Sequence, residues 1–293
     1  MVVATGFFDG VHLGHRLVIE QLVATAKARG DESLVITFWP HPRNVLQQDA
    51  RTFRLLTTLE EKKSLLYSLG VDHVEVIPFT REFSRLTMKE YLQDYVIGRF
   101  GGRTIVLGYD NRIGSDAADS DDVQKTAVSL GLEVVKTGFV APTGTAVSST
   151  WIRAMLEAGD VSSAAAMLGD GYSLTGVVVA GNRIGRTMGF PTANMQLYEP
   201  LKLVPANGVY YVGVKTLGRE FKGMCNIGCR PTVSSSSTKT IETNIFDFDE
   251  DIYGLDLEIT FIKRIREEVK FSSISELKAQ LEQDRNYCIE ISE

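Results

Sequence analysis

The sequence predicts an α/β domain followed by a mostly β domain that ends in a helix. In the first half, strand-like and helix-like segments alternate, which is the pattern of a parallel sheet with helices on both faces. Near residue 170 the hydrophobic period changes to two and glycine turns separate the segments, which favours an antiparallel barrel or sandwich. Residues 273–292 then show an amphipathic helix pattern, with a serine cap and Glu276 in the capping-box position.

Strands and helices alternate regularly through the first half. Buried-type apolar runs predict strands at 2–5, 33–39, 73–79, 104–110 and 132–138. Apolar residues at helical spacing, with caps and glycine stops, predict helices at 15–30, 57–70, 88–100 and 122–131. Ligands of parallel sheets lie at the carboxyl ends of the strands. We therefore expect three segments at strand ends to converge on one site: TGFFDG (5–10), FWPHP (38–42) and GYDNRIG (108–114).

The second half has a different organisation. Residues 148–169 have the pattern of two short helices that form a connector. Strand-like segments with period-two alternation follow at 172–181, 208–216, 219–228, 239–248 and 255–266. We assign the first domain to residues 1–155, a helical connector to 156–171 and the second domain to 172–293.

Composition and charge narrow the class of protein. Of the 293 residues, 44% are hydrophobic and 23% are charged, as in an ordinary globular protein. The net charge of −6 argues against a nucleic-acid partner, because such binders usually present a basic face. Apolar runs such as 174–180 are far too short for a membrane span, and the N-terminus lacks a signal-peptide pattern. We expect no membrane partner, and a homo-oligomer is compatible with the sequence.

The cysteines indicate a reducing compartment. There are three, an odd number, and Cys225-x3-Cys229 has no second metal-spaced pair. Buried thiols are therefore favoured over a zinc site. We expect a reduced, cytoplasmic protein.

The stretch TGFFDGVHLGHR (5–16) carries two of the four histidines, His12 and His15. If a helix begins near Val11, both imidazoles lie on one face of its first turn, beside free backbone N–H groups and the positive end of the helix dipole. The glycines would let a phosphate approach the backbone: Gly6, Gly10 and Gly14. Two imidazoles there could stabilise charge on a phosphoryl group, which suggests attack at an internal phosphorus of a nucleoside triphosphate. The alternative is a surface or capping pair.

These motifs resemble a known family. FDGVHLGHR resembles the HxGH signature of the nucleotidyltransferase superfamily and, in the form GxFDGVHxGH, the adenylyltransferase domain of bacterial bifunctional riboflavin kinase/FAD synthetases. Further motifs similar to that domain are FWPHP (38–42), GYDNRIG (108–114) and VSSTWIR (147–153). The riboflavin kinase half of the family is resembled by GRTMGFPTANM (185–195), NIGCRPTV (226–233) and IETNIFDFDEDIYG (241–254). Departures from the family pattern are Asn111, Ile113, Trp151 and Asn244.

The resemblance implies a fold and two reactions. The fold would be a Rossmann-like nucleotidyltransferase domain with a parallel sheet, followed by an antiparallel riboflavin kinase β-barrel with a terminal helix. The second domain would phosphorylate riboflavin to FMN with ATP. The first would adenylylate FMN to FAD with a second ATP and release pyrophosphate, and both steps would use Mg²⁺.

For the first domain, the resemblance implies that His12 and His15 are catalytic and stabilise the α-phosphate of ATP. It also implies ATP-binding residues: Gly6, Phe7, Asp9, Gly10, Gly14, Ser148, Ser149, Thr150 and Arg153. His41 and Asp110 would lie at the flavin, where Asp110 would hold Mg²⁺ or orient the FMN phosphate.

Several of these residues have a structural alternative. Asp9 would fix the glycine-rich turn, and Asp110 would form a turn of its own. The hydroxyls of 148–150 precede an expected helix and would cap it. Arg153 would be a solvated surface arginine, and His41 a structural histidine between two prolines.

For the second domain, the resemblance implies that Thr192 and Asn194 bind Mg-ATP through oxygen ligands suited to Mg²⁺. The other expected ATP-binding residues are Gly185, Arg186, Gly189 and Pro191. Glu242 would accept the proton of the ribityl 5′-hydroxyl as it attacks the γ-phosphate. The alternatives are a plain turn at 191–194 and a solvent-facing strand glutamate.

Two other functions remain open from the sequence. One is an HxGH nucleotidyltransferase that acts on a different phosphorylated substrate, which the kinase-like second half argues against. The other is a non-catalytic flavin- or nucleotide-binding regulator, which would show no turnover.

Overall fold

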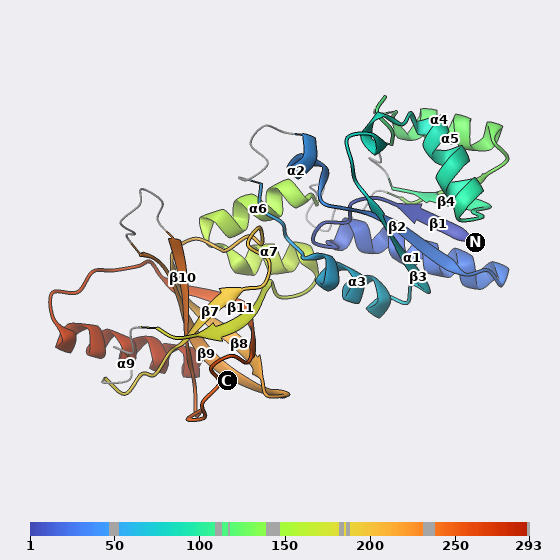
Figure 1. Ribbon diagram of the computed structural model, residues 1–293. Coiled ribbons are helices and arrows are strands. Elements are labelled where there is room, and N and C mark those ends of the chain that lie inside the picture. Colours follow the sequence, from blue (N-terminus) through green and yellow to red (C-terminus); the bar gives the residue numbers. More distant parts are fainter. Residues whose placement is uncertain are drawn as a thin grey trace. The chain divides into compact units, whose positions relative to one another are not determined.

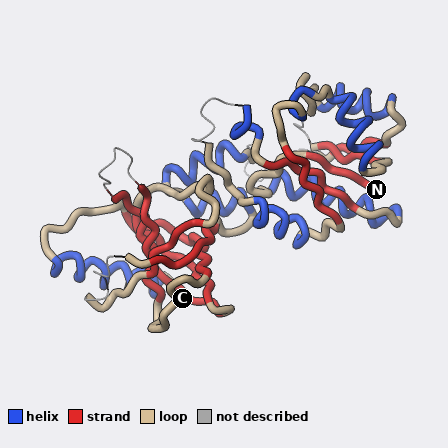
Figure 2. Tube along the Cα trace, in the orientation of Figure 1, coloured by secondary structure: helices blue, strands red, loops and turns tan. Residues whose placement is uncertain are grey.

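Two compact units make up the chain in the computed structural model, Met1–Ser149 and Thr150–Glu293. The structure describes residues 1–46, 53–108, 113–116, 118–138, 147–181, 185, 188–230 and 238–291. Helices and parallel strands form the first unit, and antiparallel strands dominate the second (Figures 1 and 2). The expected change of architecture along the chain is confirmed.

A five-stranded parallel sheet forms the centre of the first unit, in the order β3-β2-β1-β4-β5. The strands are β1 (Val2–Thr5), β2 (Ser33–Trp39), β3 (His73–Pro78), β4 (Thr104–Leu107) and β5 (Glu133–Lys136). Strand β1 pairs with β2 on one side and β4 on the other, so the strand order reverses at its end. Ligand sites of open parallel sheets lie at this kind of reversal. Strand β4 ends at Leu107, earlier than the predicted 110, and Asp110 lies outside the described residues.

Each face of this sheet is covered by helices (Figure 1). On one face, α1 (Leu13–Arg29) and α3 (Leu59–Ser68) bury a cluster that includes Ile19, Leu22 and Leu66. On the other, α4 (Met88–Glu90), the π-helix η2 (Tyr91–Arg99) and α5 (Ser120–Ser129) contribute to a second cluster. The predicted helix over 88–100 is thus mostly π-helical. The short helix α2 (Pro42–Leu46) and the 3₁₀ turn η1 (Phe83–Arg85) were not predicted.

Helix ends in this unit follow from local sequence. Thr58 accepts from the backbone of Glu61, whose carboxylate accepts from the Thr58 backbone, so a complete capping box opens α3. Helix α1 ends at Gly30, whose φ of 65° is the left-handed conformation that glycine adopts without strain.

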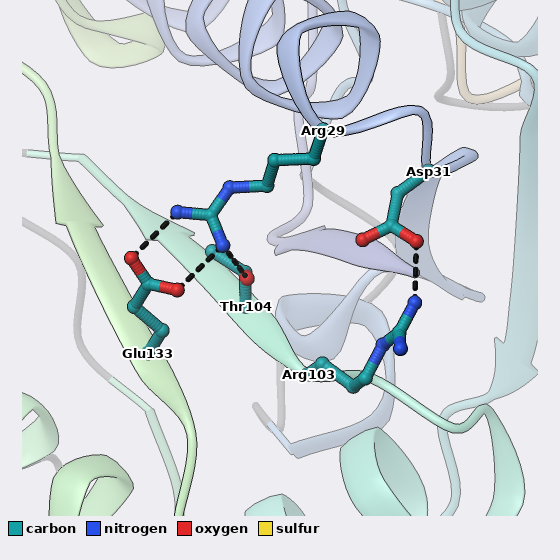
Figure 3. A network of polar contacts seen from close by, with 5 residues as sticks. All are labelled: Arg29, Asp31, Arg103, Thr104 and Glu133. Atoms are coloured by element: carbon teal, nitrogen blue, oxygen red, sulfur yellow. Dashed lines mark hydrogen bonds and ion pairs between the residues drawn. The ribbon is translucent and has the colours of Figure 1, made fainter.

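A polar network connects the amino-terminal ends of strands β4 and β5 to the end of α1 (Figure 3). Arg29 at the end of α1 donates to both carboxylate oxygens of Glu133 on β5 and to the Thr104 hydroxyl on β4. Arg103 donates to Asp31. The hydrogen bonds from Arg29 lower the pKa of the Glu133 carboxyl. The amino-terminal ends of the strands lie opposite the carboxyl ends, where a ligand is expected. The network therefore stabilises the fold and is not part of the ligand site.

The second unit contains a closed antiparallel barrel in the order β10-β7-β6-β11-β8-β9. Its strands are β6 (Ser173–Val179), β7 (Ala193–Leu197), β8 (Gly208–Thr216), β9 (Arg219–Arg230), β10 (Thr238–Ile245) and β11 (Asp256–Arg266). Two helices precede it, α6 (Ser149–Ala158) and α7 (Val161–Leu168), as predicted. The alternative of a sandwich is excluded. Strand β7 was missed, because PTANM lacks the β-branched alternation of a strand.

The terminal helix α9 (Ile274–Glu290) packs beside β9 (Figure 2). Asp284 is buried and accepts from Nε and Nη2 of Arg266 on β11, at 3.0 and 2.7 Å. Ser273 caps the helix as predicted, but Glu276 accepts from Ser272 rather than from the Ser273 backbone, so the expected capping box is only half formed.

No helix in the described part of the chain is long and apolar enough to cross a membrane. The three cysteines form no disulfide: Cys225 and Cys288 are buried, but Cys229 is exposed, contrary to expectation.

Candidate active sites

The segment that follows β1 is a tight turn with unusual backbone geometry. Gly10 has φ 85°, and Phe8 and Val11 also have positive φ, at 48° and 39°. A side chain on Gly14 would press on the His12 ring, because its Cβ would lie 3.3 Å from that ring. Non-glycine residues at positive φ carry strain, and such strain is concentrated at functional sites.

His12 and His15 are brought together by this turn. Their rings stack with centroids 3.6 Å apart and an interplanar angle of 17°. Nδ1 of His12 accepts from the backbone N–H of His15 at 3.4 Å, so His12 is the N-cap of α1. A neutral His12 therefore carries its proton on Nε2 and can donate from there. The predicted capping alternative is thus correct for His12.

The His15 imidazole is held neutral. Burial lowers its pKa well below the usual value, and His12 and Lys62 lower it further by repulsion. Nδ1 of His15 is buried and has no hydrogen-bond partner among the described residues. An unsatisfied buried polar atom costs about 1–3 kcal/mol and calls for a functional explanation.

Asp9 holds the turn against a distant segment. Its carboxylate accepts from the backbone N–H groups of Leu56 and Thr57, each at 3.1 Å, and from the Thr57 hydroxyl. The same hydroxyl accepts from Gly10 N–H. Ser149 adds a further contact by donating to the Asp9 carbonyl at 2.9 Å. This geometry is that of a turn-fixing aspartate.

Lys62 is the residue of this site that sequence reasoning missed. It lies in the first turn of α3, is 4% exposed, and its ammonium donates to the Phe7 carbonyl and the Thr37 hydroxyl, both at 3.0 Å. Burial lowers its pKa to about 8. In the sequence it stands in EEKK, which is typical of an exposed helix face, so no local signal distinguishes it from Lys63.

Aromatic side chains surround the same end of the sheet. The Phe7 ring lies 5.1 Å from both Phe38 and His41, and His41 stacks on Phe53 at 4.4 Å. Nδ1 of His41 accepts from the backbone of Arg43, at the start of α2. His41 therefore contacts the start of α2, and its position beside Phe7 keeps it near the turn.

The hydroxyls of the SSTWIR motif lie at the start of α6. The helix begins at Ser149, so only Ser148 precedes it, whereas the sequence placed all three hydroxyls before the helix. Thr150 and Arg153 follow within α6 and belong to the second compact unit.

In the second unit, strand pairing brings Glu242 and Asn194 together. Glu242 on β10 is directly opposite Asn194 on β7 and opposite Asn226 on β9. Directly paired residues project from the same face of a sheet with Cβ atoms about 5 Å apart. Glu242 is half-buried, and its neighbours Ile241 and Thr243 are buried on the opposite face.

The PTAN segment is held by its own contacts. Asn244 on β10 donates to the Pro191 carbonyl at 2.7 Å, which fastens the residue just before Thr192. Asn194 stands on strand β7, so the alternative of a plain turn at 191–194 is wrong for this residue. The chain returns at Gly181, where a Cβ would lie 2.3–2.8 Å from the Asn194 amide. This close approach allows no side chain at position 181.

The oxygens of Thr192 and Asn194 fit Mg²⁺. Hydroxyl and amide oxygens are the hard ligands this ion takes. Neither side chain has a hydrogen-bond partner among the residues the structure describes. A Cβ on Gly185 would lie 2.2 Å from the carbonyl oxygen of Phe190, and Gly189 has φ 82°. Arg186 lies outside the described residues.

Each unit thus has a polar constellation of its own. The parallel α/β unit carries a histidine-capped turn at its strand reversal, and the closed barrel pairs a carboxylate with an amide.

Comparison with known proteins gives the particular family. The family model for FAD synthetase matches residues 1–151, and the model for riboflavin kinase matches residues 168–292. A bifunctional riboflavin kinase/FMN adenylyltransferase of Bacillus subtilis is 37% identical, with 98% of this chain and 91% of that protein covered. The protein of the same description from Escherichia coli is 35% identical over 97% of this chain and 90% of its own length. The chain belongs to the bifunctional riboflavin kinase/FMN adenylyltransferase family.

A solved structure shares this fold. The crystal structure described as a macrolide-efflux protein from Streptococcus pneumoniae matches with a TM-score of 0.90 and 32% identity, over 97% of this chain and 92% of that one. The efflux description belongs to that protein.

Proposed function

We propose that the chain makes FAD from riboflavin in two ATP-dependent steps, one in each unit. The barrel unit phosphorylates riboflavin to FMN, and the α/β unit adenylylates FMN and releases pyrophosphate. The observation that carries this proposal is that both family models match one chain in order, each over a unit with its own polar constellation.

In the α/β unit, a phosphate oxygen of FMN attacks the α-phosphorus of ATP, and the bond to pyrophosphate breaks. Nε2–H of His12 donates to the α-phosphate oxygens as charge accumulates there. His15 stacks on His12 and keeps its ring in place. No covalent enzyme intermediate is needed, because positioning and electrostatics supply the rate.

In the barrel unit, Glu242 accepts the proton of the ribityl 5′-hydroxyl as that oxygen attacks the γ-phosphorus of ATP. Its pairing with Asn194 supports this role, because the base and the ATP-binding segment then share one face of the barrel. Thr192 and Asn194 would hold Mg²⁺ through oxygen atoms. When bound, the ion would neutralise phosphate charge on ATP.

Free thiols at all three cysteines support a reducing, cytoplasmic compartment for these reactions. Riboflavin, FMN and ATP are the proposed small-molecule partners.

The test is a mass-spectrometric time course with riboflavin, ATP and Mg²⁺, repeated from FMN. We expect FMN and then FAD in the first run and FAD in the second. Glu242→Gln should lower FMN formation about 100-fold or more, the usual contribution of a general base, and leave FAD formation from supplied FMN unchanged. The matched control is Glu258→Gln, another half-buried strand glutamate, on β11.

Other results would assign the chain differently. No product in either run would favour a binding protein, and full kinase activity in Glu242→Gln would exclude Glu242 as the base. A phosphorylated substrate other than FMN consumed in the second reaction would favour a different nucleotidyltransferase.

A further inference from the structure

Lys62 places a buried ammonium directly under the turn that carries the two histidines. Its Nζ atom donates to the carbonyl of Phe7, two residues before Asp9, and to the hydroxyl of Thr37 on β2. The Thr37 hydroxyl in turn donates to the Phe7 carbonyl at 3.3 Å. The lysine therefore lies between the central strands and the turn.

No described carboxylate is within ion-pair distance of this ammonium. The Asp9 carboxylate raises the pKa of Lys62, but burial lowers that pKa by more. The Asp9 carboxylate is occupied by donors of Leu56 and Thr57. Lysine is almost never buried unless it is paired, because an uncompensated charge is expensive to desolvate.

The hydrogen bonds of Lys62 do not explain why a charged side chain is buried at this position. The Phe7 carbonyl already accepts from Thr37, so its acceptor capacity is met in part without the ammonium. An apolar side chain of similar length would fill the same space without desolvating a charge. What the lysine adds is positive potential beneath the turn.

We propose that Lys62 is a positioning residue of the adenylyl-transfer reaction, and that the phosphate groups of bound substrate provide the missing countercharge to its buried ammonium. This inference rests on the function proposed above for the α/β unit. Lys62 acts through the Phe7 carbonyl, which it holds in place, and through its field on the turn from Gly6 to His15. The protein retains a destabilising buried charge because the charge strengthens the binding of an anion.

A pH dependence follows from this arrangement. The charged and titratable groups that face Lys62 are Asp9 in the turn and His15 on α1, with His12 stacked beyond it. Asp9 favours the ammonium, and His15 is neutral and does not oppose it. With a pKa of about 8, the free enzyme loses this charge at mildly alkaline pH. Bound phosphate favours the protonated form, so nucleotide binding above pH 8 should take up a proton.

The experiment compares Lys62→Met and Lys62→Arg with wild type. The control is Lys63→Met, which removes the neighbouring lysine that pairs with Glu60 on the helix surface. The pH profile of kcat/KM for ATP is measured in FAD formation from FMN, and FMN formation from riboflavin is measured on the same samples. The second activity reports on the barrel unit and normalises the amount of active protein, whereas the unfolding temperature of each variant reports whether the α/β unit is folded.

We expect Lys62→Met to lower kcat/KM for ATP about tenfold or more at pH 7, the usual effect of losing one charge that favours a bound anion. Its alkaline decline near pH 8 should disappear. Lys62→Arg stays charged at all accessible pH values, so its alkaline decline should move up by at least one pH unit. Lys63→Met should match wild type, and every variant should form FMN at the wild-type rate.

Three results would overturn the proposal. One is a wild-type pH profile in Lys62→Met, and another is an unchanged alkaline decline in Lys62→Arg, which applies even if Lys62→Met does not fold. The third is a loss of FAD formation in Lys62→Met that its lower unfolding temperature fully explains. If wild type itself makes no FAD from FMN, the proposed function has failed and Lys62 is not the cause.

Discussion

Replacement of Asp9 should destabilise the α/β unit by an amount that depends on how many donors lose their acceptor. Asp9→Ala leaves two buried backbone N–H groups, those of Leu56 and Thr57, without an acceptor. Each such orphan costs about 1–3 kcal/mol, so the unfolding free energy should fall by about 2–6 kcal/mol. That is a large share of the roughly 5–15 kcal/mol that stabilises a typical domain.

Asp9→Asn should be milder, because one carboxylate oxygen, Oδ1, accepts from both N–H groups. An amide oxygen at that place keeps both bonds, but the amide nitrogen replaces Oδ2, which accepts from Leu56 N–H at 3.3 Å. The change therefore loses the charge and this longer contact, which predicts a cost of about 1–2 kcal/mol. The measurement is urea unfolding followed by circular dichroism. Asp122→Asn is the control, since its exposed pair with Lys125 is worth less than about 1 kcal/mol. Equal stability of Asp9→Ala and wild type, or a cost of Asp9→Asn as large as that of Asp9→Ala, would refute the reasoning.

Three further predictions concern stability. Asp284→Asn should cost about 3–5 kcal/mol in urea unfolding, because the guanidinium of Arg266 keeps its charge and loses its carboxylate partner. The control Glu282→Gln, at the exposed helix surface, should cost less than about 1 kcal/mol. Between about pH 8 and 10.5 only the unfolded chain keeps the proton of Lys62, so this residue should contribute a rise of about 3 kcal/mol to the unfolding free energy. The contribution is measured as the difference between wild type and Lys62→Met in alkaline denaturant titrations, because the buried thiols of Cys225 and Cys288 act in the opposite direction in both proteins. Tyr91→Phe should cost about 1–2 kcal/mol by thermal unfolding, because the buried Thr5 hydroxyl loses its partner at 2.6 Å; no change would mean that water replaces it.

Local chemistry made much of the fold predictable. The Thr58 capping box and the glycine at position 30 depend on residues a few positions apart, and both helix ends appear where the sequence places them. The alternation of apolar runs likewise predicted the parallel sheet, because a strand buried on both faces needs apolar residues throughout. The histidine pair was predictable for the same reason, since a spacing of three is short enough for one helical turn to join.

Prediction failed where the decisive partner is distant in sequence. Strand β7 exists because its backbone pairs with β6 and β10, not because PTANM favours an extended chain. Glu242 and Asn194 are neighbours only through that pairing. Asn244, a departure from the family pattern, proves to fasten Pro191 across the barrel.

By itself, the sequence determined the class of each unit, the family resemblance and the place of the histidine turn. Only the tertiary structure decided that 193–197 forms a strand of the barrel and that the Asp9 carboxylate accepts from donors at 56–57. It also decided that Lys62, and not Lys63, is buried. The physical reason is that burial and hydrogen bonding depend on which surfaces meet, and two adjacent lysines on one helix differ only in the side that faces the sheet.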